Sequence, residues 1–231
     1  MGCGRSRVFG FVQPFEAPLN QEIMLSINRR ELFIGLGVLA VASETSVLRA
    51  SGKPGGRPVI VEAGRRVDAP EAEAPRFPPS NVSQVSRRIE ELLGKQNPQV
   101  VVCSAACGAD LLLLQAAAEM HIEQVVLLPS EPEAFRKSSV TDRPGDWGKL
   151  YDQVLKTARV EILKLPEGQE GYLETNLKLL DRGQQIARDN GVSAEALVIW
   201  NETSRGPDDV TAHFLHAAES RKMKVSEIST V

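Results

Sequence analysis

Short apolar runs alternate with longer amphipathic segments from Pro58 to the C-terminus. Short apolar runs are typical of buried strands, whereas apolar positions three or four residues apart predict helices. The expected strands are 59–61, 100–103, 125–128, 160–163, 196–200 and 225–228. The expected helices are 82–93, 109–120, 147–158, 172–190 and 209–222. This alternation predicts an α/β fold, a Rossmann-like parallel sheet with helices on both faces.

The segment before this domain has a different pattern. Residues 24–42 join a polar start, the pair Arg29 and Arg30, and an apolar run that ends in small residues, and they resemble a twin-arginine export signal. An amphipathic or buried helix capped by Asn28 is the alternative. We therefore expect an N-terminal extension (1–23), a signal-like segment and linker (24–56), and the α/β domain (57–231). The protein is exported if the segment acts as a signal, and cytoplasmic otherwise.

Composition narrows the range of partners. The 27 basic and 30 acidic residues leave a net charge of -3, which gives no general attraction for phosphate backbones or anionic lipid. Aromatic residues make up 5%, too few for an array of base-stacking side chains. The apolar stretch 32–42 is about half the ~20 residues that a membrane-spanning helix needs. We expect no nucleic-acid partner and no membrane contact of the folded domain, and a second copy of the chain stays open as a partner.

Candidate chemistry lies in three loops that follow strands. Because the carboxyl ends of parallel strands meet at one edge of a sheet, we expect these loops to form one ligand site. The expected ligand-binding residues are Gly64, Arg65, Ala106, Gly108, Ala109 and Thr211.

Each of these residue types suits a phosphorylated ligand. Arg65 supplies a guanidinium for phosphate, and a solvated basic turn is the alternative interpretation. Small residues around Gly108 let a ligand approach the free amides at a helix start, and Thr211 supplies a hydroxyl. On this interpretation Arg65 serves the ligand, and its loss leaves the fold almost equally stable.

Several segments, read together, resemble the SLOG superfamily, a Rossmann-like group that includes the lonely-guy hydrolases, DNA-processing protein A and nucleotide-sensor domains. The segments that show this resemblance are V-I-V-E-A-G-R-R-V-D-A-P, P-R-F-P, S-A-A-C-G-A-D-L-L, V-V-L-L-P, F-R-K-S-S-V with D-W-G-K-L-Y, and A-L-V-I-W-N. The resemblance runs from Arg57 to the C-terminus. It implies a pocket for a nucleotide or a nucleotide-derived ligand.

The last loop departs from the hydrolase pattern P-G-G-x-G-T-x-x-E. Thr211 matches the threonine, but Asp208 and Asp209 stand in the glycine stretch and Phe214 stands where the catalytic glutamate belongs. A general acid or base is therefore missing at that position. We expect a sensor that binds its ligand without turnover, with no catalytic residue and no cofactor.

Two other functions stay open. One is a nucleotide phosphoribohydrolase or glycosyl-transfer enzyme that uses Glu131, Asp110 or Asp208 instead, and the other is a degenerate structural or interaction domain. His213 and His216 with Asp209 present metal-ligand types on one helix face, but no fourth ligand is visible, so we expect no metal site. Cys107, just before a helix, is either a reactive thiol or a small packing residue.

Overall fold

Six parallel strands form one sheet. The computed structural model describes residues 56–231, so the N-terminal extension and the signal-like segment lie outside the described residues. The strands are β1 (Val59–Gly64), β2 (Val100–Cys103), β3 (Glu123–Leu128), β4 (Arg159–Ile162), β5 (Ala194–Trp200) and β6 (Lys224–Ser229). Their order in the sheet is β4-β3-β2-β1-β5-β6, and every neighbouring pair is parallel.

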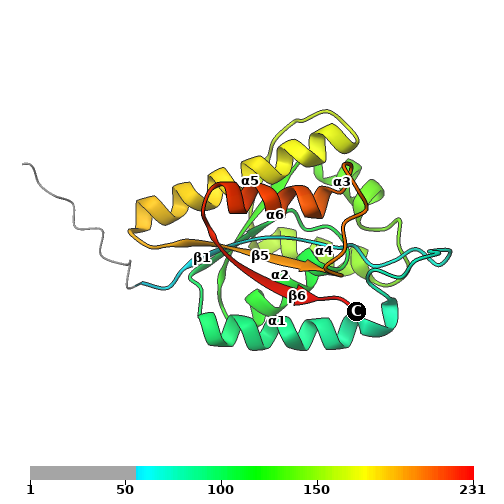
Figure 1. Ribbon diagram of the computed structural model, residues 1–231, viewed down its shortest axis with the longest axis horizontal. Helices are drawn as coiled ribbons and strands as arrows, with labels where there is room; N and C mark the ends of the chain where they lie inside the picture. Colours follow the sequence, from blue (N-terminus) through cyan, green and yellow to red (C-terminus); the bar gives the residue numbers. More distant parts are fainter. Residues whose placement is uncertain (1–55) are drawn as a thin grey trace, which may run out of the picture. The chain divides into compact units, whose positions relative to one another are not determined.

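Helices cover both faces of this sheet, which confirms the predicted α/β class. The helices are η1 (Pro79–Asn81, a 3-10 turn), α1 (Val82–Gln96), α2 (Ala109–Glu119), α3 (Pro132–Ser139), α4 (Trp147–Thr157), α5 (Gln169–Asn190) and α6 (Val210–Ser220). Helices α5 and α6 lie on one face of the sheet, and α1 and α2 lie on the other (Figure 1). Ile60 packs with the core under α1, α2 and α4, whereas its neighbours Val59 and Val61 pack with the core under α5 and α6. Side chains of a strand point alternately to its two faces, so β1 supplies both cores.

The strand order places a topological switch beside β1. The chain runs outward from β1 through β2 and β3 to β4, and α5 then returns it to β5, on the other side of β1. Helix α5 crosses β1 closely, because a Cβ on Gly183 would lie 2.1 Å from Val61 Cγ2. Such a reversal opens a crevice at the carboxyl ends of the strands.

The structure adds one helix to the sequence prediction. Helix α3 occupies part of a stretch that the pattern predicted as a polar loop. It is eight residues long, and Phe135 is its one buried apolar side chain among charged neighbours such as Glu133, Arg136 and Lys137. A helix this short shows too few repeats for its period to stand out. None of the helices within residues 56–231 is long and apolar enough to cross a membrane.

Backbone packing explains why position 108 is a glycine, and this reason was not visible in the sequence. Its φ is +100°, and a Cβ there would lie 2.8 Å from both Arg65 O and Val67 N. The glycine therefore lets the loop after β1 pack against the start of α2. This close packing is a reason for the glycine that does not involve a ligand, and contact of Gly108 with a ligand stays a prediction.

Replacing Gly108 with Ala is expected to destabilise the fold by about 1–3 kcal/mol, because the new Cβ meets backbone in a conformation that L-residues rarely adopt. Gly94→Ala is the matched control. Gly94 lies exposed within α1 with no atom within 4 Å of its Cβ position, so alanine there should stabilise by ~0.5–1 kcal/mol. Urea denaturation of the two variants measures both changes in stability. Equal unfolding midpoints for Gly108→Ala and Gly94→Ala would contradict the close approach at Gly108.

Candidate functional site

A cavity of about 660 Å³ opens at the carboxyl end of β1. Its walls come from the end of β1 and the loop that follows it, the β2–α2 loop, α3, the first half of α5 and the start of α6. This volume is ordinary for a small-molecule site, and the switch point is where parallel sheets place such sites.

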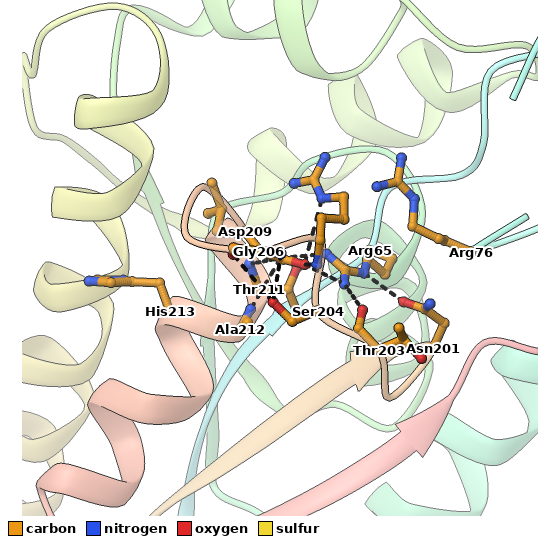
Figure 2. A network of polar contacts seen from close by, with 12 residues as sticks. Arg65, Arg76, Asn201, Thr203, Ser204, Gly206, Asp209, Thr211, Ala212 and His213 are labelled. Atoms are coloured by element: carbon orange, nitrogen blue, oxygen red, sulfur yellow. Dashed lines mark hydrogen bonds and ion pairs between the residues drawn. The ribbon is translucent and has the colours of Figure 1, made fainter. Parts of the chain in front are cut away.

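Arg65 holds the mouth of this cavity together. Its guanidinium is 5% exposed and makes two bonds to Asp209, of 2.6 and 2.7 Å (Figure 2). The same side chain donates to Asn201 Oδ1 at 3.0 Å and to Thr203 O at 2.8 Å, and it lies 5.6 Å from the Trp200 ring. One buried cation thereby fixes the loop after β5 against the end of β1.

Asp209 serves the fold in a second way, as the N-cap of α6. Its carboxylate accepts from the amides of Thr211 at 3.0 Å, Ala212 at 3.2 Å and Arg205 at 2.8 Å (Figure 2). Burial by itself would raise the pKa of Asp209, but the bonds from Arg65 and these amides outweigh it and hold that pKa well below its ordinary value. The first amides of α6 are therefore bonded to a protein carboxylate.

These contacts overturn one expectation. The sequence interpretation treated Arg65 as a side chain whose loss leaves the fold almost equally stable, but its guanidinium forms a buried ion pair. Breaking such a pair leaves an uncompensated charge in the interior and is strongly destabilising. The sequence showed two arginines in a turn and gave no sign that a carboxylate far along the chain would pair with one of them.

The start of α2 is also occupied from within the chain. The Ala109 amide donates to Arg65 O at 3.2 Å, and the Cys107 amide donates to Ser139 O at 3.0 Å. The Ala106 amide donates to Asp110 Oδ2 at 3.1 Å. These internal bonds leave fewer amides for an anion than the sequence interpretation assumed.

Four of the six expected ligand-binding residues line the cavity, namely Gly64, Arg65, Ala106 and Thr211. Gly108 and Ala109 are buried and are not among its lining residues. That a ligand contacts the four lining residues stays a prediction.

Helix α5 supplies a wall that the sequence interpretation missed. Gln169, Tyr172, Thr175, Asn176 and Leu179 line the cavity at helical spacing. The signal was present, because Thr175 and Asn176 are polar residues buried in the apolar stripe of this helix. Asn176 also donates to Val210 O at 2.7 Å, which ties α5 to the start of α6.

Arg76 presents a cation to the same cavity. Asp68 Oδ2 accepts from the amides of Arg76 at 2.8 Å and Phe77 at 2.9 Å, which closes the loop and fixes the Arg76 backbone. Within residues 56–231, the half-buried guanidinium of Arg76 has no hydrogen bond and no ion pair. Burial, and then the charges of Arg205 and Arg65, lower the pKa of Arg76. This arginine was not among the residues selected from the sequence.

Two carboxyl groups lie at the β1–α2 wall of the cavity. Glu62 is fully buried, and neither of its carboxyl oxygens has a hydrogen-bond partner among the described residues. Burial, and then the charge of Asp110, raise the pKa of Glu62 well above its ordinary value. Burial also raises the pKa of Asp110 to about 6, against the bonds from nearby amides. Burial therefore favours the neutral form of Glu62, whereas the bonds from the amides favour the charged form of Asp110.

Three weaker candidates, for a reactive thiol, a metal site and a catalytic carboxylate, have surroundings that do not suit that chemistry. Burial raises the pKa of Cys107 to about 12, so its thiol is not activated, and the packing interpretation holds. Asp209 is bonded to Arg65 instead of standing with His213 and His216, and no group of three metal-ligand residues occurs within the described part of the chain. Glu131 is exposed at the start of α3 and is not among the residues that line the cavity.

The buried Glu62 carboxyl predicts a pH dependence of stability. The folded state keeps a proton on Glu62 above the ordinary pKa of 4.5, where the unfolded chain loses it, so wild-type stability falls as the pH rises from there. The fall is at most about 1.4 kcal/mol per pH unit. Glu62→Gln places a neutral group of the same size there and removes this pH dependence. In thermal unfolding from pH 4.5 to 8, the stability of the variant relative to wild type should increase as the pH rises. A difference in stability that stays constant with pH would contradict the raised pKa of Glu62.

The chain is similar to two solved structures of DNA processing protein A at low sequence identity. No protein-family model matches the chain, and no curated protein matches it. DNA processing protein A from Streptococcus pneumoniae matches with a TM-score of 0.37 and 13% identity, over 73% of this chain and 58% of that one. DNA processing protein A from Helicobacter pylori, described in its single-stranded DNA binding mode, matches with a TM-score of 0.37 and 14% identity, over 73% of this chain and 75% of that one. The chain thus spans less than two thirds of the first of these proteins.

This comparison corrects one prediction about partners. The sequence analysis excluded a nucleic-acid partner, and that exclusion is contradicted because one of these structural neighbours binds single-stranded DNA. The physical reason lies in how charge is distributed. A net charge of -3 averages over the whole chain and does not describe the charge of any one surface, so by itself it excludes no nucleic-acid partner.

Proposed function

We propose that residues 57–231 form a SLOG-type domain that binds an anionic, nucleotide-type small molecule in the cavity at the carboxyl end of β1, without turnover. The size of the cavity and its place at the switch point support this proposal. The motifs that resemble the superfamily contribute to its walls, since Gly64, Arg65, Ala106 and Thr211 lie there.

The observation that carries the proposal is the guanidinium of Arg76. It is a half-buried cation that has no partner within residues 56–231, and it lies close enough to Arg65 and Arg205 for their charges to lower its pKa. Asp209 compensates Arg65, and it also lies 3.6 Å from Arg205. A phosphate between Arg76 and Arg205 would supply the missing negative charge through charge-assisted hydrogen bonds.

The rest of the cavity suits the remainder of a nucleotide. Val67, Phe135 and Leu179 supply apolar surface for a base. Tyr172 and Thr211 line the same space with hydroxyl groups, which can bond a sugar. A few polar groups within a mainly apolar wall are typical of small-molecule sites.

Binding without turnover is supported by the state of the last loop. Asp209 is engaged with Arg65, and Phe214 is buried in the core where the hydrolase pattern has its glutamate. One observation favours an enzyme as the second candidate: Asp110 lines the cavity with a pKa of about 6, in the range of a general acid or base. Incubating the protein with a nucleotide and measuring release of free base or phosphate distinguishes the two.

Calorimetric titration of the full chain with adenosine 5′-monophosphate (AMP) and other mononucleotides tests the proposal. The double variant Arg76→Gln/Arg205→Gln should bind at least about tenfold more weakly, because each lost charged hydrogen bond is worth roughly 1.5–3 kcal/mol. Its thermal midpoint should stay near that of wild type, since Arg76 has no ion pair within residues 56–231 and the Arg205 side chain is exposed and lies 3.6 Å from Asp209, which keeps its closer bonds to Arg65.

The matched control is Arg159→Gln, an exposed arginine on the edge strand β4, which should bind like wild type. Binding of AMP by the double variant with wild-type affinity, or no binding of any nucleotide to wild type, would overturn the proposal.

A further inference from the structure

Glu62 is a polar group without a partner at a place where one can be supplied. Both carboxyl oxygens are buried without a donor in the described part of the chain, and the residue belongs to the wall of the cavity. Native proteins rarely leave buried polar groups unbonded, and exceptions concentrate at functional sites. The carboxyl is therefore a candidate part of the ligand site.

Gly64 makes room for this arrangement. A Cβ on Gly64 would lie 2.7 Å from Glu62 Oε1 and 2.3 Å from the Ala109 Cβ. The absence of a side chain at this position is thus a condition for placing the Glu62 carboxyl beside the first turn of α2, which carries Asp110.

Within residues 56–231, no cationic side chain is bonded to Glu62 or Asp110. The charged and titratable groups that face them are Arg66 from the loop after β1, and the buried thiols of Cys103 and Cys107. Arg66 is engaged elsewhere, because it makes bonds of 2.9 and 3.0 Å to Asp142. Asp110 accepts a bond from the Ala106 amide and is 6% exposed.

The cavity therefore has two chemically different walls. The loops after β1 and β5 supply the cations Arg76 and Arg205 together with the carboxylates Asp68, Glu71 and Asp208, whereas β1 and α2 form an acidic wall of Glu62 and Asp110. A simple anion such as free phosphate satisfies only the first of these walls.

We propose that Asp110, beside the buried carboxyl of Glu62, binds a hydrogen-bond donor of the ligand, so that the ligand is a nucleotide with an N–H or O–H donor away from its phosphate. This inference rests on the proposed function and specifies its ligand class. The donor is either an amino group of the base or a hydroxyl of the sugar. Because the ionised carboxylate is the stronger acceptor, the contribution of Asp110 weakens as the pH falls below about 6.

Calorimetry on the full chain tests this with three probes: AMP; purine riboside 5′-monophosphate, which lacks the amino group and has no other N–H on the base; and 2′,3′-dideoxyadenosine 5′-monophosphate, which lacks the sugar hydroxyls. Asp110→Asn should bind AMP at least about tenfold more weakly than wild type at pH 7.5. This ratio should shrink by roughly fourfold at pH 5.5, where most wild-type Asp110 is protonated. The ratio isolates Asp110, because the titration of the ligand's own phosphate is common to both proteins.

The two analogues identify the donor. The analogue that lacks it should bind wild type and Asp110→Asn equally, and either identity supports the proposal. Glu62→Gln should keep AMP affinity within about threefold and the same pH midpoint, because it replaces one neutral group by another. Glu119→Gln, an exposed change at the end of α2, is the matched control and should match wild type.

Two results would overturn the inference alone. One is AMP binding that depends on Arg76 and Arg205 but is equal in wild type and Asp110→Asn at both pH values. The other is a loss in Glu62→Gln as large as that in Asp110→Asn. If none of the three probes binds wild type, the proposed function fails and this inference fails with it.

Discussion

The buried ion pair of Arg65 and Asp209 is the contact on which the geometry of the cavity depends. It joins the loop after the first strand to the cap of the last helix, which lie 144 residues apart in the chain. Arg65 also accepts the first amide of α2 through its carbonyl, and its own amide donates to Ile199 O. The ends of β1 and β5 and the starts of α2 and α6 are thus positioned by one residue and its partner.

Pairing divides the charged residues of the site into two groups. Arg65 with Asp209, and Arg66 with Asp142, compensate each other and hold loops in place. The guanidinium of Arg76 and the carboxyl of Glu62 have no partner in the described part of the chain. Because a buried charge or polar group without a partner is costly, the second group points to a ligand, whereas the first accounts for the architecture.

The fold could be predicted further from the sequence than the site. Apolar runs such as Val59–Val61 and the helical spacing of Val85, Ile89 and Leu93 reflect burial, which acts locally and shows in the pattern. The edge of the sheet where the loops meet followed from the parallel topology. Helix α3 was missed because eight residues show too little of a period.

The roles of single residues depended on pairings that no local pattern contains. Arg65 and Arg76 are both arginines in a polar loop, and only the position of Asp209 decides which one is compensated. Glu62 stood beside an apolar run without any sign that it was buried without a donor. Long-range contacts set the charge state of these groups, so sequence reasoning found the loops and misassigned side chains within them.

A double-mutant cycle on the ligand-free protein tests most directly whether the ion pair of Arg65 and Asp209 holds the site together. Arg65→Met, Asp209→Asn and the combination are compared with wild type by urea denaturation at pH 7, and asparagine keeps the ability to cap α6. Arg65→Met alone should lower the free energy of unfolding by about 3–5 kcal/mol. The coupling energy between the two substitutions should be at least ~2 kcal/mol. Additive losses, with a coupling near zero, would contradict the claim that this pair holds the site together.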